Sequence, residues 1–343
     1  MKAVIMAGGE GRRLKAVSGE LPKPMVPLLG RPMLEHITAL LKKHGFTDIC
    51  MAVKYHAEDI IEHFGDGSQF GLRIRYSIEE EPLGTAGAVK NCESFWQGED
   101  FLVISGDAAC DMDLSALYSQ HRSSGAAATL ALCRSAEPLS YGLALTDSDG
   151  AIRCFIEKPA WPQVVTDLVN TGIYIISPRA MEAVPVQQPW DFAKDLFPRL
   201  LSKGEILKGI ALDGYWCDVG SPLSYYRCCV DALEGRLSIE PSPAFANSAA
   251  ERRTESRIQY EDEESLICRC KNRAALMGVL SGAMLDMGAD YSDGLSLEGK
   301  GYRLHIAPLA DGSAVRVAVR SADAEFARSL ALSASELIAA LDM

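Results

Sequence analysis

Short apolar runs alternate with amphipathic stretches along the first hundred residues. The apolar runs predict buried strands, and the stretches in which apolar residues recur at helical spacing predict helices. The predicted strands cover residues 1–6, 49–53, 72–77 and 101–105, and the predicted helices cover residues 33–44, 57–64 and 85–92. Regular alternation of strand and helix is typical of a parallel sheet covered by helices on both faces, and such a sheet binds ligands at the carboxyl ends of its strands.

The pattern also divides the chain. Further strand-like segments lie at 127–133, 142–146, 152–157 and 168–176, and a helix is predicted at 223–234 before Gly235. We therefore expect residues 1–235 to form one α/β domain. Residues 236–265 contain the proline, serine and charged runs of a linker. Residues 266–343 predict a small α+β domain, with helices at 272–287 and 322–341 and strands at 302–308 and 314–320.

Composition and charge narrow the classes of function. The chain has 343 residues, 48% of them hydrophobic and 23% charged, so it can bury a large core. No apolar run approaches the roughly 18 residues of a membrane-spanning helix, and the first residues do not resemble a signal peptide. We therefore expect a cytoplasmic protein without a membrane partner. The formal net charge of −12 opposes a nucleic-acid partner. The ten cysteines lack the C-x-x-C spacing of a zinc or redox site.

A glycine-rich loop with basic neighbours follows the first predicted strand. Its members are Gly8, Gly9, Gly11, Arg12, Arg13 and Lys23. Glycines allow backbone N–H groups to approach a ligand closely, and amides turned one way in such a loop bind phosphate oxygens. In an acidic chain, this basic cluster indicates a bound phosphate. The loop matches neither a dinucleotide fingerprint nor a Walker motif. The structural alternative is a tight turn between a strand and a helix.

Two aspartates far apart in the sequence suggest a metal. Asp107 ends the segment SGD after a predicted strand, and Asp218 lies in the apolar segment WCDVG. Carboxylates near phosphates would repel them by about 4 kcal/mol for each pair of unit charges 4 Å apart at an effective dielectric near 20. A hard divalent cation such as Mg²⁺ would remove this repulsion. Taken singly, an aspartate after a strand is more often a helix cap or a turn former.

Seven short motifs occur in order along residues 1–235. They are GGEGRRL (8–14), PKPMVP (22–27), LGTAGA (83–88), SGD (105–107), EKP (157–159), NTGIY (170–174) and WCDVG (216–220). Together they resemble the motifs of the sugar-1-phosphate nucleotidyltransferases, also called nucleoside-diphosphate-sugar pyrophosphorylases. The resemblance implies a Rossmann-like nucleotidyltransferase domain with a mostly parallel mixed sheet. It also implies Mg²⁺-dependent transfer of a nucleotidyl group from an NTP to a hexose 1-phosphate, with release of pyrophosphate.

The resemblance implies roles for single residues as well. The catalytic residues would be Arg13 and Lys23 at the phosphates, with Asp107 and Asp218 as Mg²⁺ ligands. The nucleotide-binding residues would be Ala7, Gly8, Gly9, Gly11, Arg12, Gly84, Thr85 and Ala86. The sugar-phosphate-binding residues would be Gly142, Glu157, Lys158, Asn170 and Thr171. The chain departs from the family pattern at Arg12, where a small residue is usual, and at residues 14–18.

The choice of substrates follows from a narrower resemblance. The run DFAKDLFP (191–198) is similar to that of mannose-1-phosphate guanylyltransferases, which favours GTP and mannose 1-phosphate. UTP or dTTP with glucose 1-phosphate is the leading enzymatic alternative. A non-catalytic regulatory subunit that binds a sugar nucleotide is an alternative from another class. Because a sugar 1-phosphate is largely a dianion at pH 7, its attack on the α-phosphorus needs alignment and charge neutralisation rather than a general base.

The carboxy-terminal segment has a resemblance of its own. The runs DGLSL (293–297), YRLHIAP (302–308) and VRVAV (315–319) resemble the last domain of phosphomannomutases and phosphoglucomutases. The phosphate loop of those enzymes is missing, because residues 307–312 read APLADG. We therefore expect no mutase activity, and we expect this domain to be either a remnant or an interaction module that contacts another copy of the chain or another partner.

Overall fold

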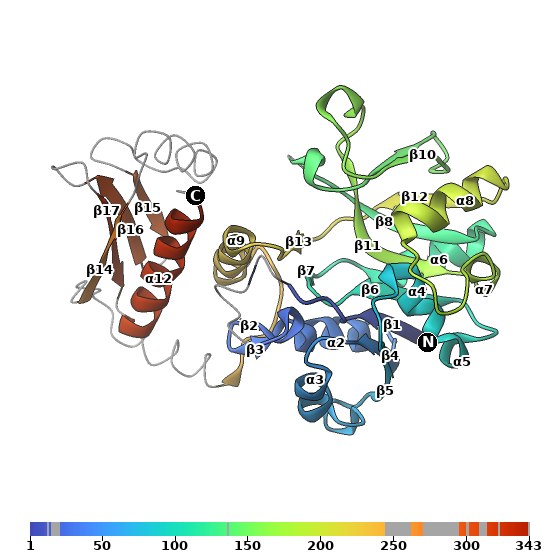
Figure 1. Cartoon of the computed structure of the whole chain (residues 1–343), viewed down its shortest axis with the longest axis horizontal. Helices are drawn as coiled ribbons and strands as arrows, with labels where there is room; N and C mark the ends of the chain where they lie inside the picture. Colours follow the sequence, from blue (N-terminus) through green and yellow to red (C-terminus); the bar gives the residue numbers. More distant parts are fainter. Residues whose placement is uncertain are drawn as a thin grey trace. The chain divides into compact units, whose positions relative to one another are not determined.

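The computed structural model describes residues 1–11, 14, 21–135, 137–243, 262–269, 295–299, 302–308, 314–321 and 323–341. These residues form two compact units, which Figure 1 draws with their helices and strands labelled. The first unit contains the described residues up to Val219, except Leu14, together with Leu237–Ile239. The second contains Leu14, Gly220–Arg236 and the described residues from Glu240 onward. No described helix is long and apolar enough to cross a membrane.

Nine described strands form the mixed sheet at the centre of the first unit. They are β1 (Lys2–Met6), β4 (Asp48–Val53), β5 (Arg73–Ile78), β6 (Phe101–Ser105), β8 (Ala128–Arg134), β9 (Leu143–Thr146), β10 (Ile152–Ile156), β11 (Leu168–Ile176) and β12 (Leu207–Ala211). The order is β10-β9-β11-β6-β1-β4-β5, with β8 beside β11 and β12 beside β8. Strands β6, β1, β4 and β5 are parallel, and β11 runs antiparallel to β6. The predicted α/β fold with a mostly parallel mixed sheet is confirmed.

Helices cover both faces of this sheet. They are α2 (Met33–Lys43), α3 (Ala57–Phe64), α4 (Gly84–Asn91), α5 (Glu93–Trp96), α6 (Leu114–Ser124), α7 (Pro178–Met181) and α8 (Phe197–Ser202). Successive residues of β1 point into different cores, as the pleat of a strand requires. Val4 packs in one core with Val89 of α4, and Ile5 packs in the other with Leu34 and Leu41 of α2. Burial on both faces explains why β1 is a nearly continuous apolar run.

Short elements complete the first unit. They are the 3-10 turns η2 (Lys23–Met25), η3 (Ser68–Phe70), η4 (Pro138–Ser140) and η5 (Trp161–Gln163), the hairpin strands β2 (Pro27–Leu28) and β3 (Arg31–Pro32), and the π-helical turn η6 (Phe192–Leu196). A separate antiparallel ribbon pairs β7 (Ala108–Cys110) with β13 (Trp216–Asp218). The hydrophobic pattern does not predict this ribbon, because strands of three residues carry too little periodicity.

The second unit contains α9 and a small sheet. Helix α9 (Pro222–Leu233) begins with a capping box in which Ser221 and Ser224 satisfy each other's backbone N–H groups. The antiparallel sheet has the order β14-β17-β16-β15, and its strands are β14 (Asp262–Arg269), β15 (Leu295–Gly299), β16 (Tyr302–Pro308) and β17 (Ala314–Ser321). Helix α12 (Ala324–Leu341) packs against β14 and β17. Alternate residues of β16 and β17, such as Leu304 and Val317, are buried.

The strands predicted at 302–308 and 314–320 and the final helix are confirmed, while the linker prediction is wrong at its end. Strand β14 begins at Asp262, so it includes the last residues of the predicted linker. The register pairs Asp262–Arg269 of β14 with Ala314–Ser321 of β17. Helix α9 groups with the second unit, although the pattern placed it in the first domain. The helix predicted at 272–287 lies outside the described residues. The end of the first domain at residue 235 stays a prediction.

Candidate functional site

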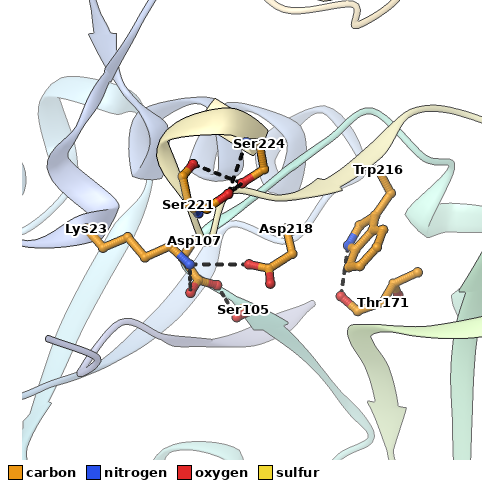
Figure 2. A network of polar contacts seen from close by, with 8 residues as sticks. All are labelled: Lys23, Ser105, Asp107, Thr171, Trp216, Asp218, Ser221 and Ser224. Carbon is orange, nitrogen blue, oxygen red and sulfur yellow. Dashed lines mark hydrogen bonds and ion pairs between the residues drawn. The ribbon is translucent and has the colours of Figure 1, made fainter. Parts of the chain in front are cut away.

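Asp107, Asp218 and Lys23 meet at one point of the first unit. The Lys23 Nζ atom lies 2.6 Å from Asp107 Oδ2 and 3.2 Å from Asp218 Oδ1. Figure 2 shows the ammonium group between the two carboxylates. The Lys23 side chain is 8% exposed, whereas those of Asp107 and Asp218 are 33% and 35% exposed. The two carboxylates are therefore open to a ligand while the lysine is enclosed.

The ribbon explains why aspartates so far apart in the sequence meet. Asp107 directly precedes β7, Asp218 ends β13, and the register pairs Asp218 with Ala108. The backbone N–H of Val219 also donates to the Asp107 carbonyl at 3.3 Å. At Gly106 a Cβ atom would lie 2.9 Å from the Met6 carbonyl oxygen, so only glycine allows β6 to end this close to β1. The site thus lies at the carboxyl ends of β1 and β6, where a parallel sheet binds ligands.

Lys23 stabilises the ionised form of Asp107, and the two aspartates stabilise the protonated form of Lys23. Burial would raise the pKa of the Asp107 carboxyl, but the charge and hydrogen bond of Lys23 and a hydrogen bond from Ser105 hold this pKa below its ordinary value. The Ser105 hydroxyl donates to Asp107 Oδ1 at 2.5 Å. Burial would lower the pKa of Lys23, but the charges of Asp107 and Asp218 raise it above its ordinary value. At neutral pH Asp107 is therefore ionised and Lys23 is protonated.

The donor set at this point fits Mg²⁺. The described residues contain no cluster of three or more histidine, cysteine, aspartate or glutamate side chains that could enclose a metal. Mg²⁺ is commonly bound by one or two carboxylates, with water and substrate phosphates as the remaining ligands. Asp107 and Asp218 offer such a pair of hard oxygen donors, and the seated Lys23 ammonium shows that the space between them accepts a cation.

The glycine loop contacts this cluster at Gly11, which lies against the Lys23 side chain. Gly11 has φ +64°, and a Cβ atom there would lie 2.7 Å from Lys23 Cβ, so both the backbone conformation and the space require glycine. The backbone N–H of Ala7 donates to Ala52 of β4 at 2.8 Å, which fixes the start of the loop. Gly9 has open space where a side chain would lie. The predicted phosphate ligands Arg12 and Arg13 lie outside the described residues.

The loop predicted to contact the base is held by the segment before η6. The Thr85 hydroxyl donates to Asp191 Oδ2 at 3.0 Å and accepts the backbone N–H of Phe192 at 2.9 Å. At Gly84, which has φ +70°, a Cβ atom would lie 2.7 Å from the Trp190 carbonyl oxygen. Gly84 is therefore required by packing, and Thr85 is fixed by its two hydrogen bonds. A contact of Gly84, Thr85 and Ala86 with a base stays a prediction.

The residues predicted at the sugar lie on β9–β11 and the turns next to them. A Cβ atom at Gly142 would lie 2.7 Å from Glu157 Oε2, and the Asn170 backbone N–H donates to the Gly142 carbonyl at 2.8 Å. These contacts bring Gly142, Glu157 and Asn170 together. Burial and the charge of Asp191 raise the pKa of Glu157, against the opposing charges of Lys158 and Lys194.

Thr171 and Lys158 depart from a simple lining role. The Thr171 side chain is buried and its hydroxyl donates to the Ala131 carbonyl at 2.8 Å, while its own carbonyl accepts the Trp216 indole N–H at 2.9 Å (Figure 2). Lys158 is exposed and has φ +45°, although Pro159 follows it. A left-handed lysine before proline is strained, and such strain often occurs at functional sites.

A family comparison identifies the group to which this architecture belongs. A model of the nucleotidyl transferase family matches residues 2–235. The chain belongs to this family. A UTP–glucose-1-phosphate uridylyltransferase from Synechocystis is 37% identical over 253 residues, which are 70% of this chain and 64% of that protein. A mannose-1-phosphate guanylyltransferase from Mycobacterium tuberculosis is 33% identical over 250 residues, which are 73% of this chain and 68% of that protein. The chain thus spans about two thirds of these relatives.

Solved structures agree with this membership. HddC from Yersinia pseudotuberculosis is 31% identical, with a TM-score of 0.58 over 66% of this chain and 97% of HddC. One HddC crystal structure is complexed with GMP-PN. A putative glucose-1-phosphate thymidylyltransferase from Bacillus anthracis is 25% identical, with a TM-score of 0.63 over 72% of this chain and 99% of that protein. The sugar-1-phosphate nucleotidyltransferase resemblance of residues 1–235 is confirmed.

Several further residues surround the site without belonging to the predicted set. Trp216 donates to Thr171 and packs edge to face on Tyr141, with ring centroids 5.2 Å apart. Burial and the charge of Asp218 raise the pKa of Tyr141 to about 12. Asp191 holds Thr85 and caps η6. Only Asp191 carries a local signal, since its side chain accepts N–H groups two and three residues ahead, as a helix cap does.

Proposed function

We propose that the chain catalyses Mg²⁺-dependent transfer of a nucleotidyl group from an NTP to a hexose 1-phosphate. The observation that carries this proposal is the meeting of Asp107, Asp218 and Lys23 beside the glycine loop. Such a cluster can bind a polyphosphate with its cation, and membership of the nucleotidyl transferase family supports this reading. The names of the relatives, which act on sugar 1-phosphates, support it further.

In the proposed reaction a phosphate oxygen of the sugar 1-phosphate forms a bond to the α-phosphorus of the NTP. The bond between the α-phosphorus and the oxygen that bridges it to the β-phosphorus breaks, and pyrophosphate leaves with that oxygen. Bound Mg²⁺ would neutralise charge on the phosphates. The loop amides of Gly8, Gly9 and Gly11 would hold the triphosphate, with Arg12 and Arg13, and the Lys23 ammonium would stabilise charge near the α-phosphate.

The sugar side of the proposed site would hold the attacking group in line. The Lys158 ammonium would pair with the sugar phosphate, and Glu157 and Asn170 would bind the sugar hydroxyls. Glu157 and Asn170 lie against the Gly142 backbone, where the Glu157 carboxylate and the Phe155 ring leave no room for a side chain. Alignment of this kind supplies much of the rate, because the attacking phosphate is already ionised at neutral pH.

For the substrates we propose GTP and mannose 1-phosphate. The guanylyltransferase relatives and the GMP-PN complex of HddC support guanine. The 37% identical uridylyltransferase favours UTP with glucose 1-phosphate as the second candidate. Contact with a second copy or another partner is assigned, in this proposal, to residues 266–343, which lie outside the family match. The cytoplasm is the proposed location.

A substrate panel tests the proposal. The full chain is incubated with Mg²⁺, each of GTP, UTP, dTTP, ATP and CTP, and mannose or glucose 1-phosphate, while pyrophosphate release is followed. We expect release with GTP and mannose 1-phosphate. Silence across the panel refutes the enzyme, and binding of a nucleotide sugar without turnover supports the non-catalytic alternative.

Matched variants test the site itself. Asp107→Asn should lower turnover on the order of 100-fold, because it removes one of the two negative charges that would hold Mg²⁺ at the reacting phosphates. Asp149→Asn makes the same chemical change in an exposed turn and should leave turnover unchanged. Full activity of Asp107→Asn would show that the metal assignment is wrong.

A further inference from the structure

The Lys23 ammonium takes the place between the two carboxylates that the proposed function gives to a divalent cation (Figure 2). Its Nζ atom donates to Asp107 Oδ2 at 2.6 Å and to Asp218 Oδ1 at 3.2 Å. The Ser105 hydroxyl donates to Asp107 Oδ1 at 2.5 Å. Three of the four carboxylate oxygens therefore already accept a hydrogen bond, and Asp218 Oδ2 has no such donor among the described residues.

The root of the Lys23 side chain is fixed, while its far end reaches the carboxylates. A Cβ atom at Gly11 would lie 2.7 Å from Lys23 Cβ and 3.3 Å from Lys23 Cγ and Cδ, so the glycine loop lies against the stem of this side chain. The Lys23 carbonyl accepts the Val26 backbone N–H at 3.2 Å, which closes the turn η2. Only the far end of the side chain can therefore change position without moving the backbone.

An ammonium group and a divalent cation compete for this place. Like charges repel, and they repel more strongly in a partly buried site than in water because the effective dielectric is lower. The Lys23 side chain is only 8% exposed, so its charge is poorly screened by solvent. A divalent cation that enters between Asp107 and Asp218 must therefore displace the ammonium first.

Bound phosphate groups would offer the ammonium another partner. Phosphate oxygens accept charge-assisted hydrogen bonds from an ammonium as carboxylate oxygens do. The glycine loop that would hold them touches the Lys23 stem at Gly11. The ammonium can therefore pass from the carboxylates to a polyphosphate on this loop by rotation of its own side chain.

We propose that Lys23 is an internal counter-ion that keeps divalent cations out of the site until phosphate groups draw its ammonium away from Asp107 and Asp218. This inference rests on the proposed function, which supplies the phosphate ligand. Metal and polyphosphate then bind with positive cooperativity, since each favours the state in which the ammonium has left the carboxylates.

A purely structural role for Lys23 predicts the opposite change in metal binding. If Lys23 only held the two carboxylates in position, its loss would weaken the binding of a divalent cation. If it excludes cations, its loss strengthens that binding. Lys23→Gln removes the charge but keeps an N–H donor, and Lys23→Met removes both. Lys203→Met is the matched control, because Lys203 is exposed.

The test measures equilibrium binding of Mn²⁺ to the full-length wild type and to each variant without nucleotide, from the loss of the paramagnetic resonance signal of free Mn²⁺. We expect Lys23→Gln and Lys23→Met to bind Mn²⁺ about tenfold more tightly than the wild type, or better. Lys203→Met should keep the wild-type affinity. Asp218→Asn added to Lys23→Gln should abolish the gain, and melting curves will show that each variant is folded.

A second titration uses the complex of Mn²⁺ with inorganic triphosphate, which has neither base nor sugar. Here both Lys23 variants should bind about tenfold more weakly than the wild type, because the ammonium that pairs with phosphate is missing. The same substitution thus strengthens binding of the metal alone and weakens binding of its triphosphate complex.

The outcomes separate this inference from the proposed function. Unchanged or weaker Mn²⁺ binding in the Lys23 variants overturns the exclusion of cations, even where the wild type releases pyrophosphate. A nucleotide-free wild type that binds Mn²⁺ with micromolar affinity between Asp107 and Asp218 overturns it without any Lys23 variant. Opposite changes in the two titrations support the counter-ion, and if pyrophosphate release is absent as well, they refute the catalytic proposal alone.

Discussion

Asp111 forms two hydrogen bonds with Tyr215, and these bonds join the end of β7 to the start of β13. Its Oδ1 atom accepts the Tyr215 backbone N–H at 2.6 Å, and its own backbone N–H donates to the Tyr215 carbonyl at 3.2 Å. The other carboxylate oxygen accepts the backbone N–H of Ser238 at 2.8 Å. One side chain thus ties β7 to the start of β13, and so determines where Asp218 lies relative to Asp107.

Asp111→Ala should therefore loosen the candidate site from a distance. We expect the free energy of unfolding to fall by about 1–3 kcal/mol, because two backbone N–H groups lose their acceptor. Turnover should fall as well, since Asp218 is no longer held opposite Ala108. Urea unfolding and pyrophosphate release measure the two effects. Asp111→Asn keeps one acceptor and should show smaller changes. Reduced stability with full turnover would contradict the positioning role.

Thr85→Val tests whether the hydroxyl that holds Asp191 also positions the nucleotide loop. The change keeps the shape of the side chain but leaves the Phe192 N–H without its acceptor and Asp191 without one donor. We expect a loss of about 1–2 kcal/mol in unfolding free energy and a higher KM for the NTP with little change in kcat. Thr85→Ser keeps the hydroxyl and should retain the wild-type KM. An unchanged KM in Thr85→Val would confine Thr85 to packing.

Local signals account for the part of the fold that the sequence predicts. Strands such as β1 and β6 are short apolar runs because both faces are buried, and helix α2 shows its spacing because one face meets the core. The ribbon of β7 and β13 has no such signal, since its two strands have three residues each and pair across more than one hundred residues. The sequence does not predict strand β14, because the strand begins with three consecutive acidic residues, which are typical of a linker.

The residues of the candidate site likewise fall into those that the sequence predicts and those that it does not. The meeting of Asp107, Asp218 and Lys23 could be expected, because each lies in a recognisable motif and the reaction needs them together. The residues that hold the site in place could not. Asp111 acquires its partners Tyr215 and Ser238 only through tertiary packing, so nothing near it in the sequence marks its importance.

Lys23→Met should change how the free energy of unfolding depends on pH below neutral pH. The pKa of Asp107 is lowered mainly by Lys23 against the effect of burial, so this pairing stabilises the fold above the unfolded pKa near 3.9 and is lost as pH falls through the lower folded pKa. The raised pKa of Lys23 contributes stability below about pH 10.4 that is lost as pH rises through the folded value.

Urea unfolding of the wild type and Lys23→Met between about pH 2.5 and 7 measures this coupling. We expect the variant to be less stable at neutral pH, where two carboxylates face each other without the ammonium, and to lose less stability on acidification. Lys203→Met, which removes an exposed lysine elsewhere, should keep the wild-type profile. Parallel profiles for the wild type and Lys23→Met would show that the ion pairs do not stabilise the fold.

Lys158 offers a test in which stability and binding change in different ways. Its left-handed backbone, with φ +45° before Pro159, costs about 1 kcal/mol for a residue with a side chain and little for glycine. Lys158→Gly and Lys158→Ala both remove the ammonium, so each should raise the KM for the hexose 1-phosphate by about tenfold, as loss of one charge-assisted hydrogen bond does. Lys158→Gly alone relieves the strain, so its free energy of unfolding should exceed that of Lys158→Ala by about 1 kcal/mol.

Lys158→Arg keeps the charge and the strain, and should change KM least. Wild-type KM in both the glycine and alanine variants would remove Lys158 from the sugar-phosphate site, and equal stability of those two variants would show that the φ angle carries no strain.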